Sequence, residues 1–237
     1  MKLIARFRLI PLLIIGLIAC AGHDTHTPDM TIRQRIGNSY GVQYFSQVEQ
    51  IQYTFNVKAG EKQISRFWIW EPKINRVTFK GMDYQDAVTY HRHEIETTAS
   101  SALKRVDAWF INDNYWLFFP FHIAWDTDAK VEDIGRQKLP MGNGRARCVV
   151  VTYSATEGNT PGDVYEVYLA NDDRLQQWVY RRGGSDQSAQ ITTWENHRQV
   201  GPLVISLNHQ GEDENFRVWF TGVGIKLTGS DSWMFAE

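Results

Sequence analysis

The chain has 237 residues, and 25 Lys and Arg against 27 Asp and Glu give it a formal net charge of −2 at pH 7. It has no strongly basic stretch, which argues against nucleic acid as a partner. Only two Cys residues occur, Cys20 and Cys148, so a scaffold of several disulfides is excluded and the fold must be held by its core.

The N-terminus has the features of an export signal. Lys2, Arg6 and Arg8 precede an apolar run over residues 9–17, which is shorter than the roughly 20 residues that a membrane-spanning helix needs. A basic start, a short apolar stretch and small residues after it are typical of a secretory signal, which we place at residues 1–19. The last residues before the mature chain are Leu17-Ile18-Ala19, followed by Cys20.

This ending resembles the lipobox of bacterial lipoproteins. The resemblance implies that the Cys20 thiol receives a diacylglycerol, that the chain is cut before Cys20, and that the new amine is acylated, for example with palmitate. One acyl chain binds a membrane reversibly, whereas two or more hold a protein there stably. Ala21 follows in place of Asp, which resembles the outer-membrane pattern and predicts an anchored protein facing the periplasm. The alternative is an ordinary signal peptide with an unrelated Cys at its end.

Behind this anchor we predict a short tether and one domain. Residues 20–28 are polar and end in Pro28, which is typical of a flexible linker. Residues 29–237 form the domain. Its first segment, residues 29–48, has apolar residues at partly helical spacing and predicts a helix. A second helix is predicted within residues 94–109, which are rich in helix-forming residues.

Strands are predicted through most of the remaining chain. Residues 51–57 alternate apolar and polar side chains, which is the period of a half-buried strand. Gly and Pro residues separate the following segments. The predicted strands are residues 51–57, 64–71, 75–80, 84–92, 132–139, 145–154, 163–170, 175–182, 191–197, 203–208 and 216–226.

The order of these elements predicts the fold class. Strands do not alternate with long helices, which disfavours a parallel sheet and favours an antiparallel meander that curls into a sandwich or barrel. We therefore expect a mainly β domain with a curved sheet of about ten strands and helices against one face. Pro120 and Pro161 should lie in turns or at strand edges, because Pro cannot donate to a sheet ladder.

Aromatic residues are the strongest chemical signal, with 9 Trp, 10 Tyr and 12 Phe. Several strands carry apolar or aromatic side chains on both faces, and residues 109–125 are denser still. One face must form the core, and the second either lines a cavity or packs under helices. The alternative is that the rings interlock and fill the interior at native density. The predicted ligand-binding side chains are those of Trp68, Trp70, Trp116, Phe119, Trp178 and Tyr180.

The lipobox, the predicted meander and three aromatic segments together resemble the LolA/LolB-type superfamily, which includes a periplasmic carrier and an outer-membrane receptor for lipoproteins. The likeness spans residues 51–226. It implies an unclosed β-barrel whose open side is covered by helices over an apolar cavity. Only Cys20 can be carried over as a functional residue, and it places this chain closer to the anchored members than to the soluble carrier. The matching segments are residues 67–70, 114–120 with 125–126, and 160–165 with 178–180.

Signals for catalysis or metal binding are weaker. His91 and His93 are spaced i, i+2 on a predicted strand and could bind zinc together with His122 and Asp126. The alternative is an exposed strand end with solvated imidazoles. We assign no catalytic residue, metal or cofactor.

The expected function is therefore a lipid-anchored cell-envelope protein that binds an apolar ligand, such as an acyl chain or the lipid of a lipoprotein. The alternatives are an envelope hydrolase or metal-dependent enzyme on the same scaffold, or a structural envelope lipoprotein without a ligand.

Overall fold

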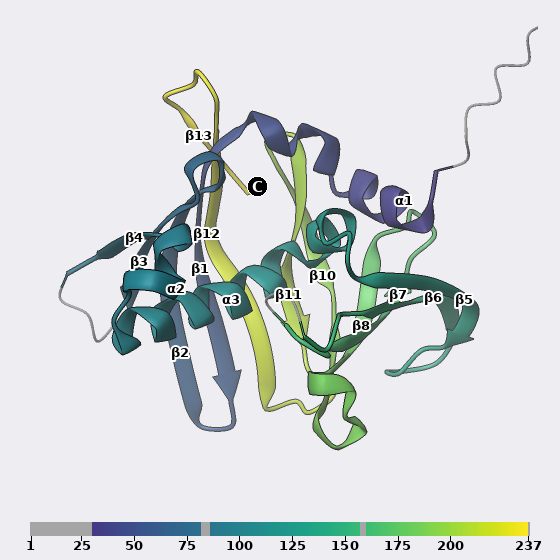
Figure 1. Ribbon diagram of the computed structural model, residues 1–237. Coiled ribbons are helices and arrows are strands. Elements are labelled where there is room, and N and C mark those ends of the chain that lie inside the picture. Colours follow the sequence, from purple (N-terminus) through teal and green to yellow (C-terminus); the bar gives the residue numbers. More distant parts are fainter. Residues whose placement is uncertain (1–29, 82–85, 157–159, 237) are drawn as a thin grey trace, which may run out of the picture.

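The computed structural model describes residues 30–81, 86–156 and 160–236, which fold into two antiparallel sheets and three α-helices (Figure 1). The helices are α1 (Ile32–Ser39), α2 (Ile95–Thr98) and α3 (Ser101–Trp125). The eight-stranded sheet contains β1 (Val48–Ala59), β2 (Lys62–Glu71), β3 (Arg76–Gly81), β4 (Val88–His91), β10 (Glu195–Val200), β11 (Leu203–Gln210), β12 (Phe216–Leu227) and β13 (Trp233–Phe235). The five-stranded sheet contains β5 (Lys130–Lys138), β6 (Arg145–Thr152), β7 (Val164–Leu169), β8 (Leu175–Arg181) and β9 (Ala189–Thr193).

Neither sheet closes into a barrel. The main path of the larger sheet runs β10-β11-β12-β1-β2-β3-β4, and the smaller sheet runs β5-β6-β7-β8-β9. A single residue, Trp194, separates β9 from β10, so the chain passes directly from one sheet to the other. One isolated bridge between Thr192 and Gly211 also links them. This arrangement confirms the prediction of a mainly β, antiparallel and unclosed architecture, although the predicted single strand 191–197 is divided at Trp194.

The long helix α3 lies across the strands of both sheets (Figure 1). Phe110 contacts Trp68 of β2 with ring centroids 5.4 Å apart, and Phe119 contacts Tyr165 of β7 at 4.3 Å. The helix begins after Ser100, whose hydroxyl accepts a hydrogen bond from the Leu103 amide at 3.2 Å. Because almost every residue of its second half is buried, α3 fills the space between the sheets that a closed barrel would enclose.

Two expectations about this region were wrong. The helix does not end near residue 109 but continues to Trp125, so the aromatic segment is helical. A helix that is apolar all round belongs in a core and lacks the one-sided pattern that identifies amphipathic helices. Pro120 lies inside this helix and not in a turn, and the backbone at Phe118 is distorted to φ −114° and ψ 18°. This is the kink expected where Pro removes a helical hydrogen bond. Pro161 lies in a turn, as predicted.

The short helix α1 caps the far end of α3. Its own start is fixed by a capping box between Thr31 and Gln34. Arg33 then donates hydrogen bonds to three carbonyl oxygens at and beyond the C-terminal end of α3, those of Ile123, Asp126 and Ala129, at 2.6–2.8 Å. The bond to Ile123 satisfies a carbonyl of the last helical turn, which a helix end otherwise leaves without a partner, and the other two hold the segment that follows α3.

A buried carboxylate joins α3 to the larger sheet. Asp113 is fully buried and accepts hydrogen bonds from Arg66 Nε at 2.7 Å, Arg66 Nη2 at 2.5 Å and Trp68 Nε1 at 2.9 Å. Burial raises the pKa of the Asp113 carboxyl, while the bonds from Arg66, Asn112 and Trp68 act in the opposite direction. The buried carboxylate therefore needs these donors as hydrogen-bond partners, and the donors need the carboxylate as their acceptor.

Replacing Asp113 should be strongly destabilising. Asp113→Ala leaves the Arg66 guanidinium and the Trp68 indole without their acceptor, and we expect a loss of about 3–5 kcal/mol in the free energy of unfolding. Urea titration followed by Trp fluorescence measures this loss. The matched control is Asp186→Ala, which breaks the ion pair of a 90% exposed carboxylate with Arg181 and should change stability little. Equal losses in both variants would contradict the assigned role of Asp113.

His209 should make stability depend on pH. Burial lowers the pKa of its imidazole from 6.5 to about 3, so the folded chain keeps it neutral where the unfolded chain binds a proton. Stability is therefore lost as the pH falls from 6.5 toward 3. Between pH 6 and 4.5, urea titrations should give the wild type a slope steeper than that of His209→Gln by about 1.4 kcal/mol per pH unit. Above pH 7.5 the slopes should coincide, and identical slopes at acidic pH would refute this assignment.

Candidate ligand pocket

A pocket of about 740 Å³ lies between α3 and strands β7 and β8. One wall is a face of α3, with side chains at helical spacing of three and four residues. The floor consists of aromatic side chains from β7 and β8, and two turns form the opposite rim. The lining residues are Ala108, Ile111, Asn112, Tyr115 and Trp116 of α3, Tyr165, Trp178 and Tyr180 of the strands, and Thr160, Pro161, Asp163, Arg182 and Gly183 of the turns.

The floor is a continuous set of ring contacts. Tyr165 and Tyr180 are directly paired across β7 and β8 and stack with their centroids 4.8 Å apart. Trp178 meets the edge of Trp116 from α3 at 4.6 Å. Trp178 is 1% exposed, and its indole nitrogen has no hydrogen-bond partner in the described part of the chain. Buried polar groups in proteins are usually paired. The Trp178 nitrogen is an exception, and it lies beneath the pocket floor as an unused donor.

Asp163 organises the rim. Its carboxylate accepts hydrogen bonds from the Tyr180 hydroxyl at 3.0 Å and from the Gly183 amide at 2.8 Å. Gly183 has φ 56°, a left-handed conformation that favours glycine. Burial raises the pKa of the Tyr180 hydroxyl, and the Asp163 charge adds to this effect, so the hydroxyl remains a donor. Arg182 is exposed beside them and donates no hydrogen bond within the described residues, which leaves a positive charge at the rim.

The α3 wall is held by a buried polar network. The hydroxyl groups of Tyr115 and Tyr153 donate to the same Asp126 oxygen at 3.0 and 2.9 Å. His122 lies 3.3 Å from this carboxylate, and its ring stacks on Tyr115 with centroids 3.9 Å apart. Burial acts to raise the pKa of Asp126, but the bonds from His122, Tyr153 and Tyr115 outweigh it and lower the pKa. The ionised carboxylate therefore fixes the orientation of Tyr115 in the wall.

Three of the six predicted ligand-binding side chains line the pocket. Trp116, Trp178 and Tyr180 line it. Phe119 is fully buried directly behind, with its ring centroid 5.2 Å from that of Trp178. Trp68 and Trp70 are not in the lining and instead pack on Phe110 beneath the larger sheet, at 5.4 and 5.9 Å. The role of all six residues in ligand binding stays a prediction.

Sequence reasoning missed most of the remaining lining. Ile111, Asn112 and Tyr115 share a helix face with Ala108, and the spacing of three and four residues in this stretch could have revealed that face. Asp163 lies in the segment 160–165 that resembles the LolA/LolB type, but Arg182 had no signal, because it reaches the pocket only through the pairing of β7 with β8.

Within the described residues the weak metal candidates do not form one site, although the rings of His91 and His93 lie with their centroids 5.4 Å apart. His91 ends β4, with its Nδ1 atom 3.2 Å from the Ile74 carbonyl oxygen, and exposed His93 pairs with Glu94. His122 instead contacts Asn114 and Asp126 within α3. In the part of the chain that the structure describes, no three His, Cys, Asp or Glu side chains are grouped as a metal site.

The structure describes one of the two Cys residues. Cys148 is fully buried on β6, and burial raises the pKa of its thiol to about 11, as expected for a small core residue. Cys20, the predicted signal peptide and the tether lie outside the described residues. Among the residues that are described, no helix has the length and apolar character needed to cross a membrane.

Comparison with known proteins yields a distant structural likeness. No protein-family model matches the sequence, and no curated protein matches it. One similar solved structure is the crystal structure of a DUF1329 family protein from Desulfovibrio piger ATCC 29098. The likeness covers 84% of this chain and 95% of that chain, with a TM-score of 0.43 and 8% sequence identity. At this distance the neighbour carries no statement about function.

Proposed function

We propose that this chain is a lipid-anchored cell-envelope protein that binds an apolar ligand in the pocket between α3 and strands β7 and β8. The ligand class is an acyl chain or the lipid part of a lipoprotein. The observation that carries the proposal is the aromatic floor of a pocket of about 740 Å³, in the size range of small-molecule sites. The resemblance of the sequence segments to the LolA/LolB type points to the same ligand class.

The chemistry of the pocket suits an amphipathic ligand. Its floor offers the faces and edges of Tyr165, Trp178 and Tyr180 to an apolar body. Each methylene removed from water contributes about 0.8 kcal/mol, so burying ten of them contributes roughly 8 kcal/mol before the costs of association. At the rim, Arg182 offers a positive charge to a polar or anionic end of the ligand.

The anchor is a separate part of the proposal. We propose that Cys20 carries acyl chains that hold the domain at the outer membrane, facing the periplasm. The predicted tether, residues 20–28, would then lie between the membrane and the domain, in which Thr31 caps the start of α1. The twelve residues from Cys20 to Thr31 span at most about 40 Å when fully extended, so the domain would stay close to the membrane that supplies the ligand.

Binding can be tested with a fluorescent fatty-acid probe. We expect saturable binding to the wild type, quenching of Trp fluorescence and competition by natural phospholipid. Ile111→Glu places a charge in the half-buried α3 wall and should weaken probe binding by about tenfold or more, because the carboxylate must be desolvated. The matched control is Ile64→Glu on β2, where the side chain is 48% exposed and outside the pocket lining.

Two results would contradict the ligand proposal. Absence of saturable binding to the wild type would favour a structural lipoprotein without a ligand. Equal weakening by Ile111→Glu and Ile64→Glu would mean that the probe binds elsewhere. Urea titration of both variants shows whether they remain folded at the temperature of the assay.

The anchor can be tested by metabolic labelling with palmitate. Cys20→Ala should abolish the label and release the protein from the membrane fraction. Cys148→Ala is the matched control and should keep both the label and the membrane association, because Cys148 is buried in β6. Retention of unlabelled Cys20→Ala in membranes after a high-salt wash would refute the proposed anchor.

A further inference from the structure

A second hollow, of about 620 Å³, lies between α1, strands β5 and β6, and the turn from β7 to β8. We call it the arginine groove, because Arg35 of α1, Arg136 of β5 and Arg147 of β6 line it together. Two carboxylates, Asp133 of β5 and Asp173 of the turn, also line it. The charged groups thus come from four separate segments and face one hollow.

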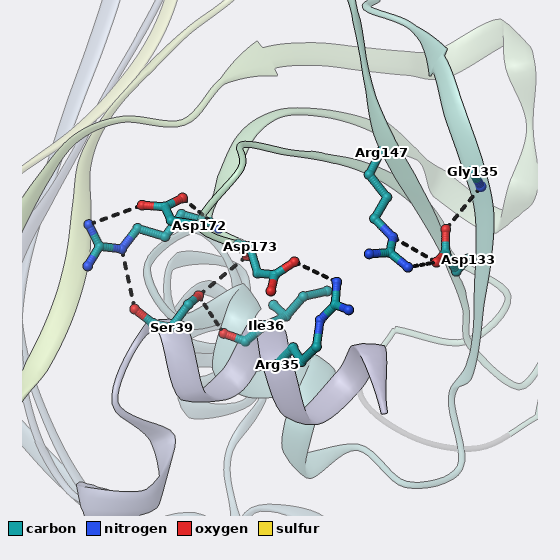
Figure 2. Close-up of polar contacts among 9 residues, drawn as sticks. Arg35, Ile36, Ser39, Asp133, Gly135, Arg147, Asp172 and Asp173 are labelled. Carbon is teal, nitrogen blue, oxygen red and sulfur yellow. Dashed lines mark hydrogen bonds and ion pairs between the residues drawn. The ribbon is translucent and has the colours of Figure 1, made fainter. Parts of the chain in front are cut away.

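Two ion pairs face each other across this groove (Figure 2). Arg35 Nη2 donates to Asp173 Oδ1 at 2.8 Å. Arg147 Nε donates to Asp133 Oδ2 at 2.7 Å, and Arg147 Nη2 lies 2.5 Å from the same oxygen in the ion pair. The hydrogen bond from Arg147 lowers the pKa of the Asp133 carboxyl, and the charge of Arg35 adds to this effect across the groove. The pairs are therefore close enough to interact electrostatically.

Arg136 is the third cation, and no carboxylate pairs with it within the described residues. Strand β5 has a bulge between Asp133 and Arg136, where Gly135 adopts φ 74°. Beyond the bulge, Arg136 Nη2 donates to the Arg145 carbonyl, and Arg145 Nη2 donates to the Arg136 carbonyl, both at 2.6 Å. These reciprocal bonds hold two guanidinium groups at one end of the hairpin from β5 to β6.

Many donors in the groove are unused. A guanidinium group has five N–H donors. Arg35 and Arg136 each use one in the bonds described above, and the Nε atom of Arg35 is buried without a partner in the described structure. The three lining arginines exceed the two lining carboxylates by one positive charge. A ligand for this groove should therefore bring negative charge and several acceptor atoms.

We propose that the arginine groove binds a phosphate-type oxyanion through Arg35, Arg136 and Arg147. A carboxylate offers two coplanar oxygens and suits a single guanidinium fork, whereas a phosphoryl group presents acceptors in several directions and can accept from three forks at once. Asp133 and Asp173 hold two of these arginines in place, in the way that outer carboxylates orient a binding residue.

Such a phosphoryl group can come from a phospholipid headgroup or from free phosphate. The headgroup source depends on the proposed anchor, which would hold α1 within about 40 Å of the membrane. Binding of free phosphate does not depend on the anchor. Neither depends on the aromatic pocket, which shares no lining residue with the arginine groove.

The test uses the full chain in neutral detergent, with thermal unfolding as the readout, because a ligand that binds only the folded state raises the Tm. One arm titrates inorganic phosphate against sodium chloride at the same ionic strength. The other arm adds phosphatidylglycerol or phosphatidylcholine to the micelles. A saturable rise in Tm with phosphate indicates the free anion, and a rise with phosphatidylglycerol alone indicates the headgroup. Either rise supports an oxyanion site in the groove, provided that Arg136→Gln and Arg147→Gln weaken it.

Arg136→Gln decides whether the groove is responsible. It removes a cation that pairs with no carboxylate, so the fold should be kept, and the ligand concentration at half-effect should rise about tenfold or more. Arg147→Gln should act in the same direction. The matched control, Arg198→Gln, removes an exposed arginine of β10 whose guanidinium, among the described residues, bonds to Asn196 alone, and it should leave the response unchanged. The proposal is overturned if neither ligand raises the wild-type Tm, or if Arg136→Gln and Arg198→Gln respond alike.

Discussion

Burial of α3 between two open sheets is the constraint on which the rest of the structure depends. The helix supplies the interior that the sheets do not enclose by closing on themselves, and its polar residues must therefore find partners in the core. Three carboxylates on or next to it do so. Asp107 accepts from Tyr90 and Arg92, Asp113 accepts from Arg66 and Trp68, and Asp126 accepts from Tyr115 and Tyr153. The bonds to Asp107 tie the helix to the end of β4, those to Asp113 tie it to β2, and the bond from Tyr153 ties its C-terminal end to the segment after β6. The direction of the helix is therefore fixed by polar contacts as well as by ring packing.

The same helix explains why several strands carry apolar side chains on both faces. On the smaller sheet, Trp178 and Tyr180 face α3 and the pocket. The intervening Val179 faces the other way, into a small cluster with Cys148 and Tyr168. The aromatic residues pack differently against the two sheets. Beneath the larger sheet the rings interlock around Phe110, and beside the smaller sheet the packing leaves a pocket.

Local patterns predicted most strands but not the helix that organises them. Alternation along a strand is set by neighbours two residues apart, so β1, β2 and β12 could be placed from the sequence. The helical nature of residues 113–123 could not, because these residues are all buried and leave no polar face, and because Pro120 argues against a helix. The division at Trp194 follows from its passage between two sheets, which no local signal records. The pocket could be predicted in part. Trp116 and Trp178 were predicted as lining residues because they are aromatic, but their contact depends on where α3 crosses β8.

An unclosed sheet has a free edge, and the bulge in β5 has a consequence there. β5 is the outer strand of its sheet, so its outward amide and carbonyl groups could pair with a strand of another copy. The left-handed turn at Gly135 interrupts the regular ladder, and charged side chains such as Lys130, Glu132 and Lys138 are exposed along the strand. Irregular and charged edges resist edge-to-edge association. The irregularity beside Arg136 should therefore also weaken pairing between this edge and a strand of another copy, so that the open sheet can keep a free edge without closing into a barrel.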